Sequence, residues 1–419
     1  METLLSPAVA SLLALVVVIV FSLTSRINVG VLAVALAWPI GLGLAHWKAE
    51  TLMGVFPSSL FLTLLGVTLL FGIAQKNGTL GALARRAVRG CGGVTALLPP
   101  MFFVLAGLAS TLGPAAIAAT ALVAPLAMSV GATARVPAFL MALMVCNGAN
   151  AGNLSPFSAI GVIVQTQMHK AGLFHHDWQV FAANFVAHTF VAVAAFALFG
   201  GLALIRAPRA ALPTVVEPPL AGRHWLTIAT LVLWIAGVVC FKMNLGLSAF
   251  TAASVLIIAG AVEDGAAVGS IPWSVIVMVC GVSVLIGVLE KTGGMDLFTT
   301  LLAKITTPAS ANGMMAFVTG IISTYSSTSG VVYPAFLPAV PGLVEKLGGG
   351  DPLQIALSIN VGAAIVDVSP LSTIGALCIA ALPLTDDPKL LFRRMLIWGF
   401  AMTVVGALFC QFFIRFFAR

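Results

Sequence analysis

The chain has 419 residues, of which 60% are hydrophobic and only 8% charged, and its mean hydropathy is +1.11. A soluble domain cannot bury that much apolar surface, so the composition predicts an all-α protein that crosses a membrane many times. The formal net charge of +7 does not indicate a nucleic-acid-binding protein, because the basic residues are scattered between apolar runs. The six cysteines fall mostly within apolar runs and show no metal-ligand spacing.

Apolar runs follow one another along the chain, with one polar, proline-containing linker at 206–223. The first group lies at about 6–24, 28–46, 57–76, 94–131, 136–168 and 178–205. The second group lies at about 225–241, 246–262, 272–290, 308–344, 353–384 and 396–416. The linker therefore separates two halves of similar length, 1–205 and 224–419.

The two halves repeat each other in sequence. Residues 155–161 return at 369–375 with five of seven positions identical, Ser-Pro-Phe-Ser-Ala-Ile-Gly becoming Ser-Pro-Leu-Ser-Thr-Ile-Gly at an offset of 214. Seven residues from Pro57 to Gly78 also recur from Pro272 to Gly293, at an offset of 215. A nearly constant offset over most of the chain indicates an internal duplication.

Each Ser-Pro motif lies inside an apolar run, where it must interrupt a helix. Proline removes a helical hydrogen bond and restricts the residue before it. In hydrocarbon such a break is tolerated only where it is buried in protein or lines a wet cavity. A proline kink can also be a mere packing device, but broken helices at matching positions of two halves are typical of a transporter's binding site. We therefore predict broken helices at about 136–168 and 353–384.

The runs at 94–131 and 308–344 are too long for one span, so each is either two crossings or one re-entrant helical hairpin. Hairpins leave five crossings in each half, and an odd number makes the repeats inverted; two crossings would make them parallel. With the N-terminus outside, the inside loops hold 12 of the 20 basic residues, including ten of the twelve arginines. We therefore expect two inverted repeats of about five helices, each with a re-entrant hairpin and a broken helix.

Asp367 is the candidate for binding a cation. An ionisable group at membrane depth is costly and indicates function, and Asp367 stands where the first half has Asn153. It could ligate Na⁺ with unwound carbonyls, carry a proton, or bond to backbone freed by Pro370. Glu290, beside Lys291 at the end of a run, is expected to reach the interface. The predicted cation ligands are Asn147, Asn150, Asn360 and Asp367, with Na⁺ possible at Asn147, Asn150 and Asp367.

No lysine or arginine lies deep in a predicted span. An anionic substrate would therefore be held by hydroxyls, amides, backbone N–H groups and the positive ends of helices. Serine and threonine also pack small faces between membrane helices, which is the competing interpretation for each of them. His188 is more typical of a core histidine than of a proton relay. The predicted substrate-binding residues are Ser110, Thr111, Gly113, Pro114, Asn153, Ser155, Ser158, Ser326, Ser327, Thr328, Ser369, Ser372 and Thr373.

Sequence motifs of enzymes are absent. There is no Gly-x-Ser-x-Gly, His-Glu-x-x-His or phosphate-binding-loop pattern, so we expect no catalytic residues and no enzyme activity. No cofactor is expected beyond a coupling ion, Na⁺ or H⁺. A channel is a closer rival than an enzyme, but paired broken helices favour alternating access.

Four stretches of the first half resemble a known family. Residues 56–64, 73–79 and 112–116, and 148–152 followed by Ser155-Pro156, are similar to the N-terminal region of MatC-type malonate/dicarboxylate carriers. The repeat with hairpins and Ser-Pro breaks resembles the wider ion transporter superfamily, which includes the divalent anion/sodium symporters. In those symporters a Ser-Asn-Thr sequence at each hairpin tip touches substrate and Na⁺. Here Ser326-Ser327-Thr328 replaces the Asn by Ser, and Leu112-Gly113-Pro114 departs further.

The resemblance implies a homodimer with a scaffold domain at its interface and an elevator-like transport domain. It also implies cation-coupled import of a small dicarboxylate such as malonate across the bacterial inner membrane. The expected partners are thus a small anion and the lipid bilayer, with no nucleic acid. The alternatives are an inorganic-anion or cation/proton antiporter of the same superfamily, or an anion channel.

Overall fold

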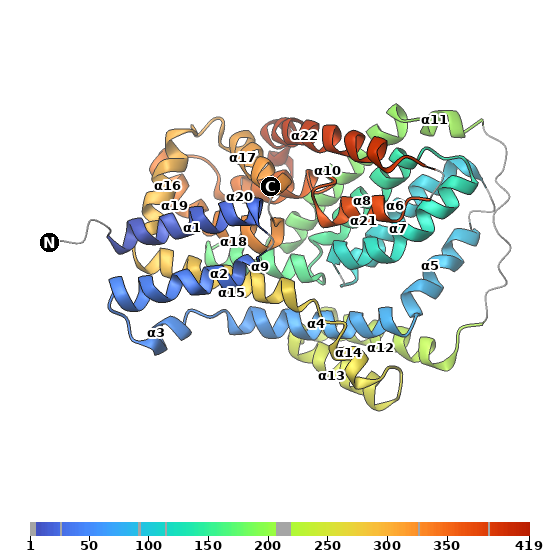
Figure 1. The fold of residues 1–419 in the computed structure, drawn as a ribbon, viewed down its shortest axis with the longest axis horizontal. Helices are drawn as coiled ribbons and strands as arrows, with labels where there is room; N and C mark the ends of the chain where they lie inside the picture. Colours follow the sequence, from blue (N-terminus) through green and yellow to red (C-terminus); the bar gives the residue numbers. More distant parts are fainter. Residues whose placement is uncertain are drawn as a thin grey trace.

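The computed structural model describes residues 6–25, 27–90, 94–113, 115–206, 219–325, 327–383 and 386–419. In these ranges all regular structure is helical (Figure 1). The first half contains α1 (Pro7–Thr24), α2 (Val29–Trp38), η1 (Pro39–Leu44), α3 (Ala49–Met53), α4 (Ser58–Lys76), α5 (Thr79–Gly90), η2 (Thr95–Leu97), α6 (Leu98–Thr111), α7 (Ala115–Thr133), α8 (Ala138–Asn153), α9 (Ala159–Lys170), α10 (Asp177–Leu198) and α11 (Gly201–Leu204). The second half contains α12 (Gly222–Phe241), α13 (Leu245–Ile258), α14 (Asp264–Val268), α15 (Trp273–Lys291), α16 (Gly294–Lys304), α17 (Ala311–Tyr325), η3 (Thr328–Val332), α18 (Tyr333–Phe336), α19 (Val340–Leu347), α20 (Pro352–Ile365), α21 (Thr373–Ala380), α22 (Pro388–Phe413) and η4 (Ile414–Phe416).

Several of these helices are apolar enough to cross a bilayer. Among the described residues, α4, α7, α10, α15 and α22 have both the length and the composition of membrane spans, and shorter apolar helices accompany them. Large apolar side chains point outward on other helices, with Leu233, Phe241 and Ile258 exposed by 72%, 79% and 86%. An outward apolar surface of this kind suits contact with lipid, as expected of a multi-pass membrane protein.

The order of elements in the first half returns in the second. Helices α2, α4, α5 and α6 have counterparts in α13, α15, α16 and α17, and α8, α9 and α10 have counterparts in α20, α21 and α22. Gly66 of α4 packs on α13, where an added Cβ would lie 2.3 Å from the carbonyl oxygen of Gly246. Gly281 of α15 packs on α2 in the same way, 2.2 Å from the carbonyl oxygen of Gly30. Equivalent glycines thus join each half to the other at two related crossings.

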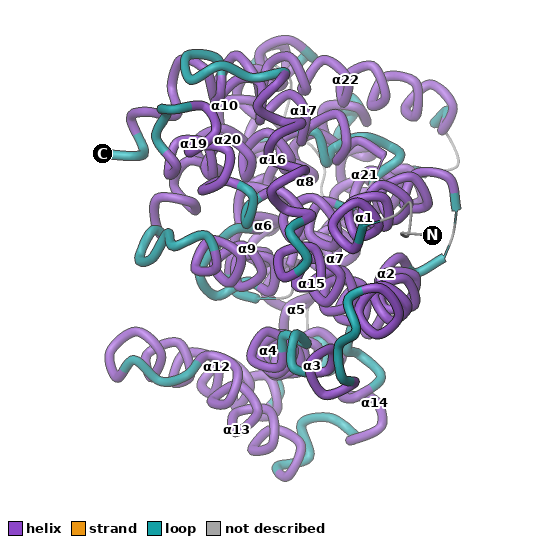
Figure 2. Tube along the Cα trace, turned by 90° about the vertical axis from the view of Figure 1, so that its left-hand side faces the viewer, coloured by secondary structure: helices purple, strands orange, loops and turns teal. Residues whose placement is uncertain are grey.

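The helices form two packed groups. One group, the α4/α15 bundle, contains α1, α2, α4, α12, α13 and α15; the other, the α8/α20 bundle, contains α6–α10 and α17–α22. Figure 2 shows α4, α12 and α13 on one side of the molecule and α8, α10, α17, α20 and α22 on the other. In the α8/α20 bundle, Gly148 lets α8 approach the backbone of Phe103 on α6, and Gly362 lets α20 approach Ala316 on α17. Close packing of small residues is how membrane helices associate.

Apolar runs alone do not predict helices that carry several charged residues. Helices α5 and α16 were not predicted, because they are amphipathic and join the longer spans at an angle (Figure 1). Helix α22 begins at Pro388, well before the predicted start at about 396. The backbone N–H of Lys389 donates to the side chain of Asp387 at 2.8 Å, so this residue caps the helix before its apolar part begins.

Candidate functional site

The first Ser-Pro motif breaks a helix between α8 and α9. Helix α8 ends at Asn153 and α9 starts at Ala159, with Ser158 as its N-cap. The Ser158 hydroxyl accepts a hydrogen bond from the backbone N–H of Gly161 at 2.9 Å and donates one to the carbonyl oxygen of Asn153. Glycine is required at 161, because a Cβ there would lie 1.8 Å from the carbonyl oxygen of Ser155. The hydroxyl therefore satisfies backbone groups from both sides of the break.

The second motif has the same geometry. Helix α20 ends at Ile365, and α21 starts at Thr373 with Ser372 as its N-cap. The Ser372 hydroxyl donates to the carbonyl oxygen of Asp367 at 2.9 Å and accepts from the N–H of Gly375 at 3.2 Å. A Cβ at Gly375 would lie 2.1 Å from the carbonyl oxygen of Ser369. The repeated sequence therefore forms the same broken helix in both halves.

The tip between α6 and α7 is fastened to the first break by three hydrogen bonds. The Ser155 hydroxyl donates to the carbonyl oxygen of Thr111 at 2.8 Å, and the N–H of Ala159 donates to the carbonyl oxygen of Gly113 at 3.3 Å. The N–H of Ala116 donates to the side-chain oxygen of Asn153 at 3.0 Å. The Asn153 amide is therefore used to position the start of α7.

The tip between α17 and η3 is fastened differently. Ser323 bonds to the hydroxyl of Thr328 and donates to the carbonyl oxygen of Ala363 on α20 at 2.7 Å. Ser327 caps η3 by accepting from the N–H of Gly330 at 3.0 Å. In contrast to Asn153, the side chain of Asp367 makes no hydrogen bond to the described residues of this tip.

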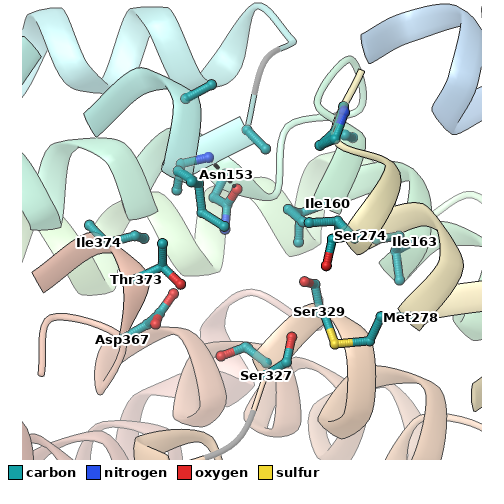
Figure 3. A pocket seen from close by; sticks show the side chains of 18 of the residues that line it. Asn153, Ile160, Ile163, Ser274, Met278, Ser327, Ser329, Asp367, Thr373 and Ile374 are labelled. Atoms are coloured by element: carbon teal, nitrogen blue, oxygen red, sulfur yellow. Dashed lines mark hydrogen bonds between the residues drawn. The ribbon is translucent and has the colours of Figure 1, made fainter. Parts of the chain in front are cut away.

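A cavity of about 560 Å³ lies between the two bundles, where both breaks and both tips meet. Figure 3 shows Asp367 and Thr373 side by side on one wall, and Ser274, Ser329 and Met278 on the opposite one. The α4/α15 bundle contributes α4, the residues after α1 and the start of α15. The lining from the α8/α20 bundle comprises 115–118, Asn153, Ala159, Ile160, Ile163, 323–324, 327–329, Asp367 and 371–374.

Helix N-termini converge on this cavity. The first turns of α7, α9, η3 and α21 all line it, so four positive helix ends face the same space. Within the described structure, no hydrogen bond is made by the backbone N–H groups of Thr373 and Ile374 at the start of α21. Free N–H groups at helix ends are ready donors for carboxylate or phosphate oxygens.

The charge of the lining side chains is negative. Among the described lining residues Asp367 is the one ionisable side chain, and no lysine, arginine or histidine accompanies it. Groups of three or more histidine, cysteine or acidic residues that could hold a metal ion are absent from the described part of the chain. The cavity therefore combines backbone donors for an anion with one carboxylate that can hold a cation or proton.

The structure brings together only part of the predicted substrate site. Asn153, Ser327, Thr328, Ser372 and Thr373 line the cavity. Predicted residues that do not line it are Ser110, Thr111, Gly113, Ser155, Ser158 and Ser369. The hydroxyls of Ser155 and Ser158 bond to backbone at the first break, and that of Ser369 accepts from the N–H of Leu371 at the second. Pro114 and Ser326 lie outside the described residues.

Three of the predicted cation ligands are buried away from the cavity. Asn147 of α8 bonds to Nδ1 of His188 on α10 at 3.0 Å. One turn further along α8, the carbonyl oxygen of Asn150 accepts a hydrogen bond from the side-chain amide of Asn184 on α10 at 2.7 Å. Neither Nε2 of His188 nor either amide atom of Asn150 has a partner among the described residues. Asn360 contacts Sδ of Met168, at 3.6 Å from its amide nitrogen. Of the predicted cation ligands, only Asp367 faces the cavity.

Sequence reasoning missed the part of the cavity contributed by the α4/α15 bundle. Thr68 and Gln75 of α4 line it, as do Ser270 and Ser274 near the start of α15. Ser274 is the repeat counterpart of Ser59, so the internal repeat did single it out. The repeat does not, however, distinguish a residue that lines a cavity from one that packs between helices. Asn28 orients this segment, since its amide donates to the carbonyl oxygen of Ser274 at 2.9 Å.

The fold and the cavity are those of a polytopic membrane transporter, and comparisons with known proteins agree. Residues 5–153, which end with α8, match the family model described as the dicarboxylate carrier protein MatC N-terminus. This match points to a carrier and not to an enzyme. No curated protein sequence matches the chain.

Two solved transporter structures share the fold. The YdaH transporter of Alcanivorax borkumensis aligns with a TM-score of 0.63 and 16% identity, over 87% of this chain and 88% of that one. MtrF of Neisseria gonorrhoeae, described as illuminating a class of antimetabolite efflux pumps, aligns with a TM-score of 0.60 and 14% identity, over 98% of this chain and 96% of that one. At these identities the likeness concerns the architecture alone.

Proposed function

We propose that the chain is a secondary active transporter that carries a small dicarboxylate, such as malonate, together with Na⁺ or H⁺. The observation that carries the proposal is the composition of the cavity: four helix N-termini face it, and the one ionisable side chain among its described lining residues is acidic. Helix ends attract an anion, but Asp367 repels it unless a cation or proton neutralises the carboxylate. Binding of the anion is thereby linked to binding of the cation.

The size and symmetry of the cavity suit a dicarboxylate. A volume of about 560 Å³ is within the usual range of small-molecule sites and leaves room for water beside a three- or four-carbon diacid. One pair of helix ends, α7 and α9, comes from the first half, and the other pair, η3 and α21, from the second. We propose that each pair holds one carboxylate, with hydroxyls of Ser327, Thr328 and Thr373 nearby. The match to the dicarboxylate carrier family supports this substrate class.

Asp367 is the proposed coupling residue. It either carries the proton itself or ligates Na⁺ with backbone oxygens freed at the second break. Asn150 and Asn360 each keep an amide oxygen without a partner among the described residues, so with Asn147 they remain candidates for a buried cation site behind the cavity wall. Uptake measured with each ion in turn separates these routes.

We further propose alternating access by an elevator-like movement of the α8/α20 bundle against the α4/α15 bundle. Glycines lie where the two bundles meet: Gly113, with φ of +137°, lies against the ring of Phe71 on α4, and Gly330 lies against Met278 on α15. At both contacts the α8/α20 bundle presents bare backbone to a large side chain of the α4/α15 bundle, so side chains of the two bundles do not interlock there. The proposal includes inverted repeats, a homodimer that holds the α4/α15 bundle fixed, and a place in the bacterial inner membrane.

A second candidate is cation/proton antiport without an organic anion. The single carboxylate, with no basic side chain among the described lining residues, favours it, because Na⁺ and H⁺ could compete for Asp367. The two functions differ in their need for substrate. An antiporter exchanges Na⁺ for H⁺ in liposomes that contain no dicarboxylate, whereas a symporter does not.

Uptake of radiolabelled malonate into proteoliposomes tests the proposal, first with an imposed Na⁺ gradient and then with a pH gradient. Saturable uptake that is driven by either gradient and abolished when the gradient is collapsed is the expected result. Uptake that rises linearly with malonate and ignores both gradients would indicate a channel. Absence of uptake in protein that is thermally stabilised by another anion would retain the transporter and reject malonate.

A further inference from the structure

A second cavity lies where the start of α8, the end of α10 and the first half of α22 meet. Its volume is about 460 Å³, and its lining residues are Pro137, Phe139, Phe199, Arg394, Ile397, Trp398 and Ala401. Four of these come from α22 at spacings of three or four residues, so they form a single face of that helix. We call this cavity the α22 groove. It shares no lining residue with the cavity between the two bundles.

Three aromatic rings form one end of the α22 groove. Phe139 and Phe199 lie 4.8 Å apart between ring centroids, and Trp398 lies 5.3 Å from Phe199 and 6.4 Å from Phe139. Each pair is edge-to-face, with interplanar angles of 70° to 87°. These contacts fix the rings in place, so the groove presents a rigid apolar surface rather than a collapsed one.

The guanidinium of Arg394 lies near this apolar surface, because Arg394 precedes Trp398 by one turn of α22. Arg394 is exposed and forms no hydrogen bond or ion pair with the rest of the described structure. The indole nitrogen of Trp398 is buried and also has no partner among the described residues, although a buried indole N–H normally has one. The groove therefore offers an exposed guanidinium beside an apolar trough.

The position in the chain places the groove at the edge of the membrane. Helix α22 is one of the predicted spans, and Arg394 lies near its start, close to Lys389 and Arg393. The same end of the molecule holds Arg135, two residues before Pro137, and α11, which Figure 1 shows near the start of α22. Loops this rich in basic residues mark the cytoplasmic side, where anionic lipids create a negative surface.

We propose that the α22 groove binds one anionic phospholipid. The phosphate would contact the guanidinium of Arg394, while an acyl chain covers the rings of Phe139, Phe199 and Trp398. A guanidinium recognises phosphate through paired N–H donors, which an ammonium does not provide. A free phosphate would leave the apolar trough exposed, so the occupant is a lipid and not an inorganic ion.

Native mass spectrometry of the full-length protein in detergent tests the proposal, with dioleoyl phosphatidylglycerol, phosphatidylcholine of the same acyl chains, and glycerol phosphate as probes. We expect wild-type protein to retain one phosphatidylglycerol more strongly than phosphatidylcholine, and glycerol phosphate not to bind. Arg394→Gln should weaken retention of phosphatidylglycerol by about fivefold, which corresponds to the usual contribution of one basic residue near an anionic surface. The matched control is Arg393→Gln, a neighbouring exposed arginine that does not line the groove.

Equal retention of phosphatidylglycerol by wild type and Arg394→Gln would overturn the proposal, as would equal loss in Arg393→Gln. Binding of glycerol phosphate as strong as that of the lipid would overturn the role of the acyl chain. Trp398→Phe keeps an aromatic ring and removes only a buried N–H, so it should retain phosphatidylglycerol as wild type does. Arg394→Lys keeps the charge without the paired donors and should fall between wild type and Arg394→Gln, which keeps the test valid if the glutamine variant folds poorly.

Discussion

Under the proposed function, replacing Asp367 by asparagine should separate the binding of the anion from that of the cation. The change removes the one ionisable group among the described residues that line the cavity. It also gives the second half the residue that the first half already has at Asn153. The break itself should persist, because the Ser372 hydroxyl donates to the backbone carbonyl of Asp367 at 2.9 Å.

The size of the effect follows from the dimensions of the cavity. A sphere with the volume of the cavity, about 560 Å³, has a radius of about 5 Å, which places a central anion at that distance from the wall. At an effective dielectric constant of about 20, two like unit charges at that separation repel by about 3 kcal/mol. This free energy corresponds to roughly two orders of magnitude in affinity. Without Na⁺ or H⁺, Asp367→Asn should therefore bind malonate at least about a hundredfold more tightly than wild type, because the second carboxylate of malonate adds to the repulsion.

Calorimetric titration with malonate measures this difference, with choline replacing Na⁺ and at acidic and alkaline pH. Uptake into proteoliposomes should lose its stimulation by the cation gradient in the same variant. Glu290→Gln is the matched control, since Glu290 also lies in an apolar run but does not line the cavity. If both Asp367→Asn and Glu290→Gln keep the full cation dependence of wild type, the carboxylate of Asp367 is not the coupling group.

Three further predictions concern the broken helices and the buried polar contacts. Gly375→Ala places a Cβ 2.1 Å from the carbonyl oxygen of Ser369 and should destabilise the protein by about 1–3 kcal/mol, measured as a lower thermal midpoint in detergent and a loss of uptake. The control Gly265→Ala, which has open space around it, should change neither. Equal midpoints for the two variants would refute the requirement for glycine at 375. Ser372→Ala removes the N-cap of α21 and should cost about 1 kcal/mol while raising the KM for uptake; an unchanged KM would separate the cap from substrate binding. Asn147→Leu leaves Nδ1 of His188 buried without its partner and should destabilise the protein by about 1–3 kcal/mol. Adding His188→Phe should recover part of that stability. A further loss of stability in the double variant would contradict the pairing.

The sequence predicted the breaks because their cause is local. Proline after serine cannot continue a helix, and the repeat showed that residues 155–161 and 369–375 must do the same thing. It could not show which hydroxyls face the cavity. An interrupted helix frees several backbone groups, and the nearest hydroxyls, those of Ser155 and Ser158, bond to them rather than to a ligand. The contribution of Ser274 depends on how two bundles meet, which no local pattern encodes.

The difference between the two halves is more informative than their likeness. The packing of α4 on α13 and of α15 on α2, the serine caps and the glycines beside the breaks are all duplicated. At the equivalent positions, however, Asn153 fixes the start of α7 through the N–H of Ala116, whereas Asp367 faces the cavity. The same broken helix thus closes one side of the site and leaves a charge on the other. Under the proposed function, one such substitution in a duplicated scaffold would provide a single cation-dependent position in an otherwise symmetric anion site.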